Sequence, residues 1–424
     1  MTLEAGGTVA RWHGKLSVVG LGYIGLPTAA MFASSGIDVV GVDISQRAVD
    51  AVNSGRAHIE EGNLDELVER CVRAGRLRAT TTAEPADAFI IAVPTPVGHS
   101  DDRTPDISYV QAAGCAIAPL LQAGNLVILE STSPVGTTAM LAQLFARERP
   151  DLTFPHTAGE NADVCLAYCP ERIIPGQMLK ELVENDRIIG GMSVRCAEGA
   201  AEIYKTFVRG VCHLSTDRVA EMVKLTENAF RDVNIAFANE LSMICEDLGV
   251  DVWKVVEFAN RHPRVSILNP GAGVGGHCIA VDPWFVVASA PERARLIRTA
   301  REVNDRKPHF VVEQVKRAAD QQPMARIACL GLTYKPDVDD FRESPSLEIA
   351  AALSEMYPGR VVCVDPFADA LPEVERRRHS LEFTGIDEAL HTAEILVVLV
   401  PHEAFRGIPQ PEEATIIDPV GFWR

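Results

Sequence analysis

One cysteine stands in a glycine-rich segment, GVGGHCIAVDP, which runs from Gly273 to Pro283. A thiolate is the best side-chain nucleophile near neutral pH, provided that its surroundings favour the ionised form. Asp282 follows Cys278 by four residues, so a helical turn would return its carboxylate to the same side, where it could orient a water molecule or take its proton. The glycines indicate a mobile or closely packed loop that brings backbone against a ligand. The segment therefore predicts a nucleophilic cysteine, with a buried structural thiol as the alternative.

A second candidate group lies on a long segment without proline or glycine, Thr216 to Leu248, whose pattern predicts a helix ended by Gly249. Lys224, Asn228 and Arg231 recur at i, i+4 and i+7 and so project from one face. Two cations and an amide suit an anionic substrate or a developing oxyanion, whereas a solvated helix face is the alternative. Apolar residues cover much of the remaining circumference, so we expect a buried helix whose polar stripe has partners. Its lysine is the candidate positive neighbour of the cysteine.

The motif GLGYIG directly follows an apolar strand and opens a helical segment. Gly20 permits a tight turn, Gly22 lets the backbone approach a pyrophosphate, and Gly25 allows close helix packing. Asp43, at the end of the next strand, would bond the ribose hydroxyls and repel a 2′-phosphate, which favours NAD over NADP. A tight turn with a structural aspartate is the alternative. The cofactor contacts expected at this turn also include Tyr23 and Ile24.

Two further strands end in IAVPTP and ESTSPVG. Because ligands bind at the carboxyl ends of parallel strands, we expect Thr95 and Thr132 to lie near the cofactor. The prolines in both motifs also have a simpler role, since they end strands and start helices.

Composition limits the remaining possibilities. The 424 residues are 47% hydrophobic, and the formal net charge is −18, which argues against a nucleic-acid or anionic-membrane surface. The ten cysteines are scattered without a CxxC pair, so we expect reduced thiols, no metal, and a cytoplasmic protein. Apolar runs fall short of the roughly 20 residues that a membrane span needs.

The elements that must position these groups alternate between short apolar runs and helical segments, the pattern of a doubly wound parallel sheet in the first half. Strands return near the end of the chain, where we expect a second α/β domain. The predicted strands are Lys15–Gly22, Asp38–Asp43, Ala88–Val93 and Leu126–Ser131, then Arg326–Leu332, Arg360–Pro366, Ile395–Val400 and Thr415–Pro419.

Together these motifs resemble those of the UDP-glucose/GDP-mannose dehydrogenase family. The motifs are GLGYIGLPTA, VPTP, STSPVG, YCPERIIPG, KLTENAFRDVNIAFANEL, NRHPRV, GVGGHCIAVDPWF and GLTYKPDVDDFRESP. The resemblance implies two Rossmann-like doubly wound domains joined by a long central helix and a helical middle domain, and a homodimer or higher homo-oligomer. The expected boundaries are an extension at 1–14, an NAD-binding domain at 15–212, a central dimerisation domain with the cysteine loop at 213–310, and a UDP-binding domain at 311–424.

The resemblance also implies a reaction, the four-electron oxidation of a UDP-sugar alcohol to a carboxylate with two NAD per turnover. Cys278 would hold the intermediate aldehyde as a thiohemiacetal and then as a thioester. Lys224 and Asn228 would stabilise the oxyanions, and Asp282 with Thr132 would position the hydrolytic water. Glu171 takes an acid/base role by resemblance alone.

Further contacts carry over in the same way. Arg342 matches an arginine that reaches the NAD pyrophosphate, and Arg264 and Lys335 suit the substrate diphosphate. The implied substrate contacts are Arg172, Ile173, Lys224, Asn228, Arg231, His262, Arg264, Gly275 and Lys335.

The identity of the sugar depends on one departure from the family pattern. UDP-glucose members usually carry GGxCLPKD, whereas this chain has GGHCIAVDP, which favours UDP-N-acetyl-D-mannosamine as substrate. The resemblance alone implies that the product serves surface polysaccharide synthesis. His277 could help to shape the sugar pocket. UDP-N-acetylglucosamine and UDP-glucose remain alternatives. A non-catalytic NAD-binding regulator is the alternative from another class, although such a protein would be expected to lose Cys278, Lys224 or Asp282.

Overall fold

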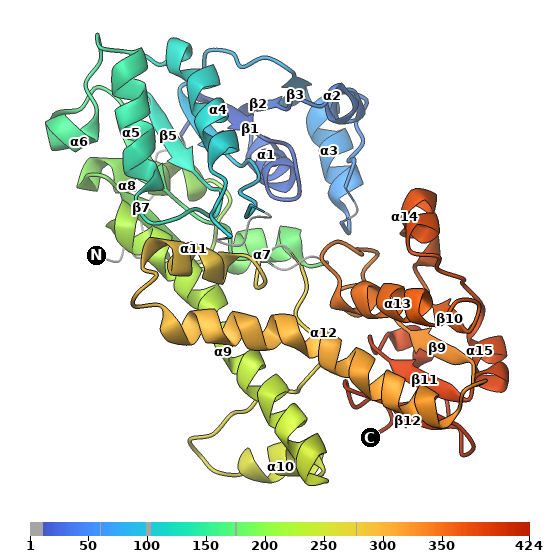
Figure 1. The fold of residues 1–424 in the computed structure, drawn as a ribbon. Helices are drawn as coiled ribbons and strands as arrows, with labels where there is room; N and C mark the ends of the chain where they lie inside the picture. Colours follow the sequence, from blue (N-terminus) through green and yellow to red (C-terminus); the bar gives the residue numbers. More distant parts are fainter. Residues whose placement is uncertain (1–11, 60, 99–102, 174–175, 277) are drawn as a thin grey trace. The chain divides into compact units, whose positions relative to one another are not determined.

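The computed structural model describes residues 12–59, 61–98, 103–173, 176–276 and 278–424, and the chain divides into two compact units between Thr226 and Glu227 (Figure 1). Within the described residues, the first unit has a sheet of eight strands and the second a sheet of four. Helices pack on both sheets, so the predicted α/β class with two Rossmann-like domains is confirmed.

The strands of the first sheet lie in the order β3-β2-β1-β4-β5-β6-β7-β8. Their bounds are β1 Lys15–Val19, β2 Asp38–Val42, β3 Leu77–Thr80, β4 Ala88–Ile91, β5 Leu126–Leu129, β6 Cys165–Tyr168, β7 Arg187–Gly191 and β8 Cys212–Thr216. The four predicted strands of this half all form, and each ends slightly before its predicted bound.

The expectation of a parallel sheet is correct from β3 to β6 and wrong at one junction. β7 pairs with β6 in the antiparallel sense, and β8 then runs parallel to β7. The connection between β6 and β7 returns to the end of the sheet that it left, so it is not a crossover and reverses the strand direction. The apolar runs of the sequence do not indicate strand direction, so they do not predict this reversal.

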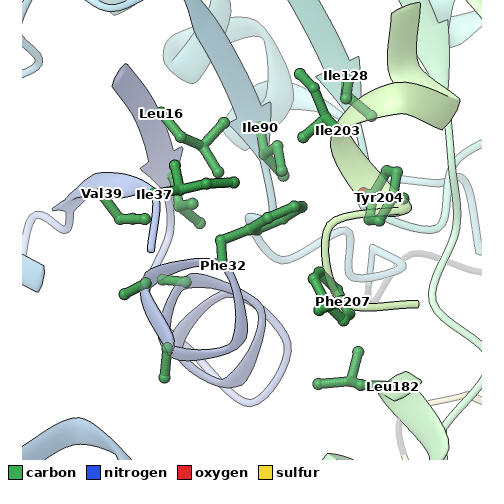
Figure 2. Packing of buried hydrophobic residues seen from close by; sticks show 14 of the residues in the cluster. Leu16, Phe32, Ile37, Val39, Ile90, Ile128, Leu182, Ile203, Tyr204 and Phe207 are labelled. Atoms are coloured by element: carbon green, nitrogen blue, oxygen red, sulfur yellow. The ribbon is translucent and has the colours of Figure 1, made fainter. Parts of the chain in front are cut away.

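Helices cover the first sheet. They are α1 Gly25–Ser34, α2 Gln46–Asn53, α3 Leu64–Arg73, α4 Ser108–Ile117, α5 Thr137–Glu148, α6 Pro155–Ala158, α7 Met178–Glu184 and α8 Val194–Tyr204. Successive strand residues face opposite sides, so Ile90 joins one buried cluster while Phe89 and Ile91 join another. Figure 2 shows Phe32 of α1 pointing towards Tyr204 and Phe207, with ring centroids 5.5 and 4.8 Å away. One tilted and one edge-on ring contact thus hold α1, which begins at the GLGYIG turn.

The second unit contains a smaller parallel sheet in the order β10-β9-β11-β12. Its strands are β9 Ile327–Leu330, β10 Val361–Val364, β11 Ile395–Val398 and β12 Thr415–Ile417, and its helices are α10 Val252–Ala259, α11 Asp282–Ser289, α12 Arg295–Gln321, α13 Pro345–Met356, α14 Glu373–Arg378 and α15 Ile386–Thr392. The long helix α9, Asp217–Leu248, begins in the first unit and continues in the second. It ends at Gly249, with φ 64°, as the sequence predicted.

The two sheets repeat one strand-to-helix turn. Gly20 follows β1 and Gly331 follows β9, with φ of 95° and 82°, and a Cβ on either glycine would strike a carbonyl oxygen of the neighbouring strand end. In both turns an aspartate from the adjacent strand, Asp43 or Asp365, accepts a backbone N–H one residue after the glycine. The second domain is therefore built on the same framework as the first.

A buried ion pair lies beneath the strand ends of the first sheet. Glu130, just after β5, is 3.5 Å from Arg187 of β7, and both side chains are almost fully buried. The Tyr204 hydroxyl donates to Glu130 at 3.1 Å, and the guanidinium lies 4.9 Å from the centroid of the tyrosine ring. Burial raises the pKa of Glu130 to about 7, against the opposing effect of the arginine charge. The charge of this carboxyl therefore changes near neutral pH.

Glu130→Gln should alter how stability depends on pH. The pKa of Glu130 is about 7 in the folded chain and near its ordinary 4.5 in the unfolded chain, so the folded state binds the proton more tightly. The resulting stabilisation is complete below the unfolded value and is lost as pH rises through the folded value. Wild type should therefore lose unfolding free energy relative to the glutamine variant between about pH 5 and pH 8 in urea titrations. Parallel pH profiles for the two proteins would contradict this assignment.

Candidate functional site

The GLGYIG turn leaves open backbone at the start of α1. A Cβ on Gly25 would lie 1.8 Å from the carbonyl oxygen of Gly20, so only glycine fits there, whereas the Cβ position of Gly22 has nothing within 4 Å. Asp43 accepts the Leu21 N–H at 2.9 Å with one oxygen and a second backbone N–H at 2.8 Å with the other. An open cradle at a helix N-terminus fits a dinucleotide diphosphate, and the fixed carboxylate fits a ribose diol.

The other residues predicted to contact the cofactor lie at this turn and at two strand ends of the same sheet. Tyr23 is exposed at the turn, and Ile24 immediately precedes α1. Thr95 and Thr132, predicted to be near the cofactor, are brought together, since the Thr95 hydroxyl donates to the Thr132 carbonyl at 2.6 Å. The Ser131 hydroxyl joins the same two strand ends through Val93, donating to its carbonyl at 2.7 Å.

The first turns of α9 hold two loops of the first unit. Glu221 is buried and accepts the N–H groups of Gly136 and Thr138 at 2.6 and 2.8 Å, which satisfies the start of α5. Burial raises the pKa of Glu221. One turn later, Lys224 donates to the Glu171 carbonyl and carboxylate, both at 2.8 Å, and is also buried. The lysine that the sequence assigned as a positive neighbour of the cysteine is thus paired with a carboxylate.

The CPER segment is ordered around this ion pair. The second oxygen of Glu171 accepts the Ile173 N–H at 2.9 Å. Arg172 donates to the Asp186 carbonyl at 3.0 Å, and its own carbonyl accepts the Asn185 amide at 2.8 Å. Three predicted residues, Glu171, Arg172 and Ile173, therefore form one well-defined segment with the lysine.

In the second unit, Cys278 is exposed and begins a helical turn. The Asp282 N–H donates to the Cys278 carbonyl at 2.9 Å, so the turn inferred from the four-residue spacing is present. Asp282 is buried, and its carboxylate accepts the side-chain amide of Asn228 from α9. The structure thus brings together the nucleophile candidate, its carboxylate and one member of the predicted polar stripe.

The glycines before the cysteine pack against protein. A Cβ on Gly273 would lie 2.6 Å from Pro345, and one on Gly275 would lie 2.5 Å from the Glu343 carbonyl oxygen. Gly276, with φ 83°, has the Tyr334 ring 3.0 Å from its Cβ position. Close packing is therefore the reason for these glycines, and the surface they meet is the 333–345 segment of the same unit. His277 lies outside the described residues.

The other predicted substrate residues are more dispersed. Arg231 was predicted to lie on the same face of α9 as Lys224 and Asn228, but it is exposed. Its neighbour Asp232 is the residue that is buried at this level of the helix. His262 and Arg264 are exposed after α10, with the Arg264 N–H donating to the imidazole at 3.3 Å.

Two residues of the 333–345 segment were also predicted to bind ligands. Lys335 is partly buried, and its carbonyl accepts the Thr333 hydroxyl at 2.9 Å. Arg342 makes a two-pronged pair with Asp340 at 2.8 and 2.6 Å.

Sequence reasoning missed most of the buried stripe on α9. Besides Lys224 and Asn228, it includes Glu221, Asp232 and Asn239, all almost fully buried. The signal was available, because polar residues recur at helical spacing along an otherwise apolar segment. The stripe continues past Arg231, which is exposed, to Asp232 and Asn239.

The remaining thiols and carboxylates form no metal site: within the described ranges, no group of three or more His, Cys, Asp or Glu side chains could hold a metal ion. All ten cysteines are described, and no disulfide joins any two of them. Cys245, Cys329 and Cys363 are buried. No described helix has both the length and the apolar character that a membrane crossing requires.

Comparison with known proteins gives these features a context. Three domain models of the UDP-glucose/GDP-mannose dehydrogenase family match the chain: the NAD binding domain at residues 14–208, the central domain at 218–306 and the UDP binding domain at 328–423.

Individual relatives agree. An NDP-N-acetyl-D-galactosaminuronic acid dehydrogenase of Ralstonia nicotianae is 56% identical over 410 residues, 96% of each chain. A UDP-N-acetyl-D-mannosamine dehydrogenase of Escherichia coli is 54% identical over 419 residues, 96% of this chain and 99% of that one. The solved structure of a UDP-D-ManNAc dehydrogenase from Pyrococcus horikoshii superposes with a TM-score of 0.85 at 38% identity, covering 96% of both chains. The resemblance predicted from the motifs is confirmed, and the chain belongs to the UDP-glucose/GDP-mannose dehydrogenase family, whose NAD-binding domain it carries.

Proposed function

We propose that this protein oxidises the C6 alcohol of UDP-N-acetyl-D-mannosamine to the carboxylate, consuming two NAD per sugar. The observation that carries the proposal is the exposed Cys278, whose turn is closed by Asp282 while Asn228 holds that carboxylate. A dehydrogenase that stops at the aldehyde needs no such thiol. Relatives that bear the mannosamine name at 54% identity support the choice of sugar.

All of the proposed cofactor contacts except Arg342 lie in the first unit. The Gly20–Gly25 turn receives the diphosphate at the start of α1, and Asp43 orients the ribose diol. Thr95 and Thr132 line the adjacent strand ends, and Arg342 reaches the pyrophosphate. When bound, NAD accepts a hydride from the sugar in each of the two oxidations.

The protein's own groups carry the steps between the oxidations. The Cys278 thiolate adds to the C6 aldehyde and forms a C–S bond, giving a thiohemiacetal. Lys224 and Asn228 stabilise the oxyanion at each tetrahedral stage. Loss of the second hydride converts the adduct to a thioester. Water positioned by Asp282 and Thr132 then attacks the thioester carbon, and the C–S bond breaks to release the uronate and restore the thiol.

Proton transfer is assigned to the buried pair of the first unit. Glu171 bonds Lys224 through one oxygen and a backbone N–H through the other, so its position is fixed. A carboxylate held beside an ammonium can exchange a proton with reacting oxygens without reorganising.

The nucleotide part of the substrate brings a diphosphate to a chain with a formal net charge of −18, so local cations must meet it. We assign this role to Lys335 and Arg264 within a UDP-binding domain at 311–424, and assign cofactor binding to 15–212. The remaining proposed substrate contacts are Arg172, Ile173, Arg231, His262 and Gly275.

A second substrate has a specific observation in its favour. The N-acetyl-D-galactosaminuronic acid dehydrogenases match at 56% and 55% identity, so a UDP-N-acetylhexosamine with different ring stereochemistry is the alternative. UDP-N-acetylglucosamine and UDP-glucose complete the substrate panel that decides between them. A non-catalytic regulator is disfavoured, because Cys278, Lys224 and Asp282 are all present. The product, an aminouronic acid nucleotide, fits polysaccharide synthesis in the cytoplasm.

We also propose that a second copy of the chain covers α9. Phe230, Phe237 and Ile244 recur every seven residues along this helix and are 68%, 54% and 48% exposed. Seven residues are close to two helical turns, so the three form one apolar strip, and α10 adds the exposed Phe258. Self-association through such a strip gives a homodimer with the same patch on each partner.

The first test is stoichiometric. With UDP-N-acetyl-D-mannosamine and excess NAD, wild type should form about two NADH per sugar consumed, as an alcohol-to-carboxylate oxidation requires. Cys278→Ser should lose steady-state turnover by at least about a thousandfold while still binding NAD, because serine is the weaker nucleophile. Progress curves and fluorescence titration with NADH measure the two properties. Undiminished turnover in the serine variant would rule out the covalent mechanism.

Asp43→Asn should weaken the preference for NAD. Removing the negative charge at the end of β2 removes the repulsion of a 2′-phosphate, so the ratio of kcat/KM for NAD to that for NADP should fall about tenfold. Asp365→Asn is the matched control, since this aspartate holds the equivalent turn of the second sheet. An unchanged ratio in the Asp43 variant would remove this carboxylate from cofactor selection.

Phe237→Asp should disrupt the dimer. A buried charge at the centre of the apolar strip should weaken association at least about thirtyfold, as measured by sedimentation equilibrium. Met324→Glu provides the control, because Met324 is an exposed apolar residue of the same unit away from α9. If the Phe237 variant sediments like wild type, the strip is not the interface.

A further inference from the structure

The cysteine segment is held by α9 at two points. Downstream of Cys278, Asn228 donates to the Asp282 carboxylate. Upstream, the Gly271 N–H donates to the side-chain oxygen of Asn239 at 2.9 Å. Residues 228 and 239 are about three helical turns apart and lie on nearly the same face of α9. Both ends of the segment are therefore bonded to side-chain amides of one helix.

The orientation of the second amide is set by a chain of buried hydrogen bonds. The NH₂ group of Asn239 donates to the side-chain oxygen of Asn304 at 2.9 Å. The NH₂ group of Asn304 donates to the Asp232 carboxylate at 2.8 Å and to its carbonyl at 3.1 Å. Because these oxygens accept, Asn304 must turn its own oxygen towards Asn239, and Asn239 must turn its oxygen towards Gly271.

A charged side chain lies at the other end of this series of hydrogen bonds. Arg301 of α12 donates to the same Asp232 oxygen at 2.6 Å, and these two side chains and both asparagines are no more than 1% exposed. Buried amides in such a network cannot exchange their hydrogen bonds for water, so a reversed amide would cost more than it would at the surface. The direction of every bond from Arg301 to Gly271 is therefore fixed.

We propose that Asn239 is a positioning residue for Cys278, oriented by Asp232 through Asn304. Between Gly271 and Gly276 there is little room to absorb a shift, since Gly273, Gly275 and Gly276 pack against protein atoms at their Cβ positions. We therefore expect a displacement at Gly271 to reach Gly276, two residues before the thiol. The inference deepens the proposed function and rests on it for the catalytic readout alone.

The direct test measures thiol reactivity in the enzyme without ligands. Asn239→Leu should change the second-order rate of Cys278 alkylation by iodoacetamide about tenfold, since a displacement of even about 1 Å alters the setting of a reactive group. Peptide mass spectrometry resolves the sites, and the exposed Cys115 serves as an internal reference. Ser242→Ala is the matched control: it removes a partly buried bond to Lys307 of α12 and a bond to the Asn239 backbone carbonyl, but neither bond involves the Asn239 side chain or Gly271. Equal Cys278 rates in both variants and wild type would overturn the proposal.

Asn239→Asp separates orientation from mere packing. A protonated carboxyl at 239 can still donate to Asn304 and accept from Gly271, whereas an ionised one faces the Asn304 oxygen with no proton to offer. The charged groups on the helices around it are Asp232 and Glu246 of α9 and Arg301, Asp305 and Lys307 of α12. At each pH, the Cys278 alkylation rate of the variant is divided by that of the wild type. This ratio should be near one at acidic pH and should differ from one by about tenfold once the new carboxyl ionises. A ratio independent of pH would show that orientation is not required.

The catalytic readout follows separately. In Asn239→Leu, a poorly placed thiol should let the aldehyde escape, so NADH per sugar should fall from two towards one while the KM for the sugar changes less than twofold. A wild-type protein that oxidises no UDP-sugar would refute the proposed function, but the alkylation results would still decide the role of Asn239.

Discussion

The structure depends on a stripe of buried polar side chains along one helix, α9. An unpartnered polar group in such a position costs about 1 to 3 kcal/mol, and a charge costs more, so every member of the stripe must find a partner elsewhere in the chain. Each member finds a different one. Glu221 secures the start of α5, Lys224 the CPER segment, Asn228 the turn after the cysteine, Asp232 the helix α12, and Asn239 the start of the glycine loop. The requirement to satisfy the polar groups of one helix thereby fixes each of these segments within its own unit.

The same reasoning explains why the two α/β domains differ in what they can bind. Both use a glycine turn braced by an aspartate, at Gly20 with Asp43 and at Gly331 with Asp365. Two residues after the first glycine, the cofactor domain has Gly22, with open space at its Cβ position, whereas the second domain has Thr333. That threonine is fully buried, and its hydroxyl lies 3.2 Å from a nitrogen of His402. A side chain fills the place where backbone would approach a diphosphate, so the shared framework does not provide a second dinucleotide cradle.

Much of this arrangement could be predicted from the sequence because its signals are local. Apolar runs located the strands β1 and β9, and the spacing of Cys278 and Asp282 predicted their turn. The antiparallel junction at β7 could not be predicted, since strand direction depends on where a connection returns and not on the strand's own residues. The ion-pair partner of Lys224 could not be predicted either, because Glu171 is distant in sequence and the pairing depends on the folded backbone.

The cysteines differ in burial and in the hydrogen bonds around them. Burial raises the pKa of Cys169 and Cys329 to about 12, so these thiols stay protonated and unreactive at neutral pH. Cys115 is also exposed but lies within the regular helix α4. Cys278 is exposed, and its own carbonyl accepts the N–H of a buried aspartate that α9 holds. Exposure gives access and the attached network holds the backbone at the thiol, and the proposed covalent relay would need both, since an aldehyde that is not captured at once is lost to water.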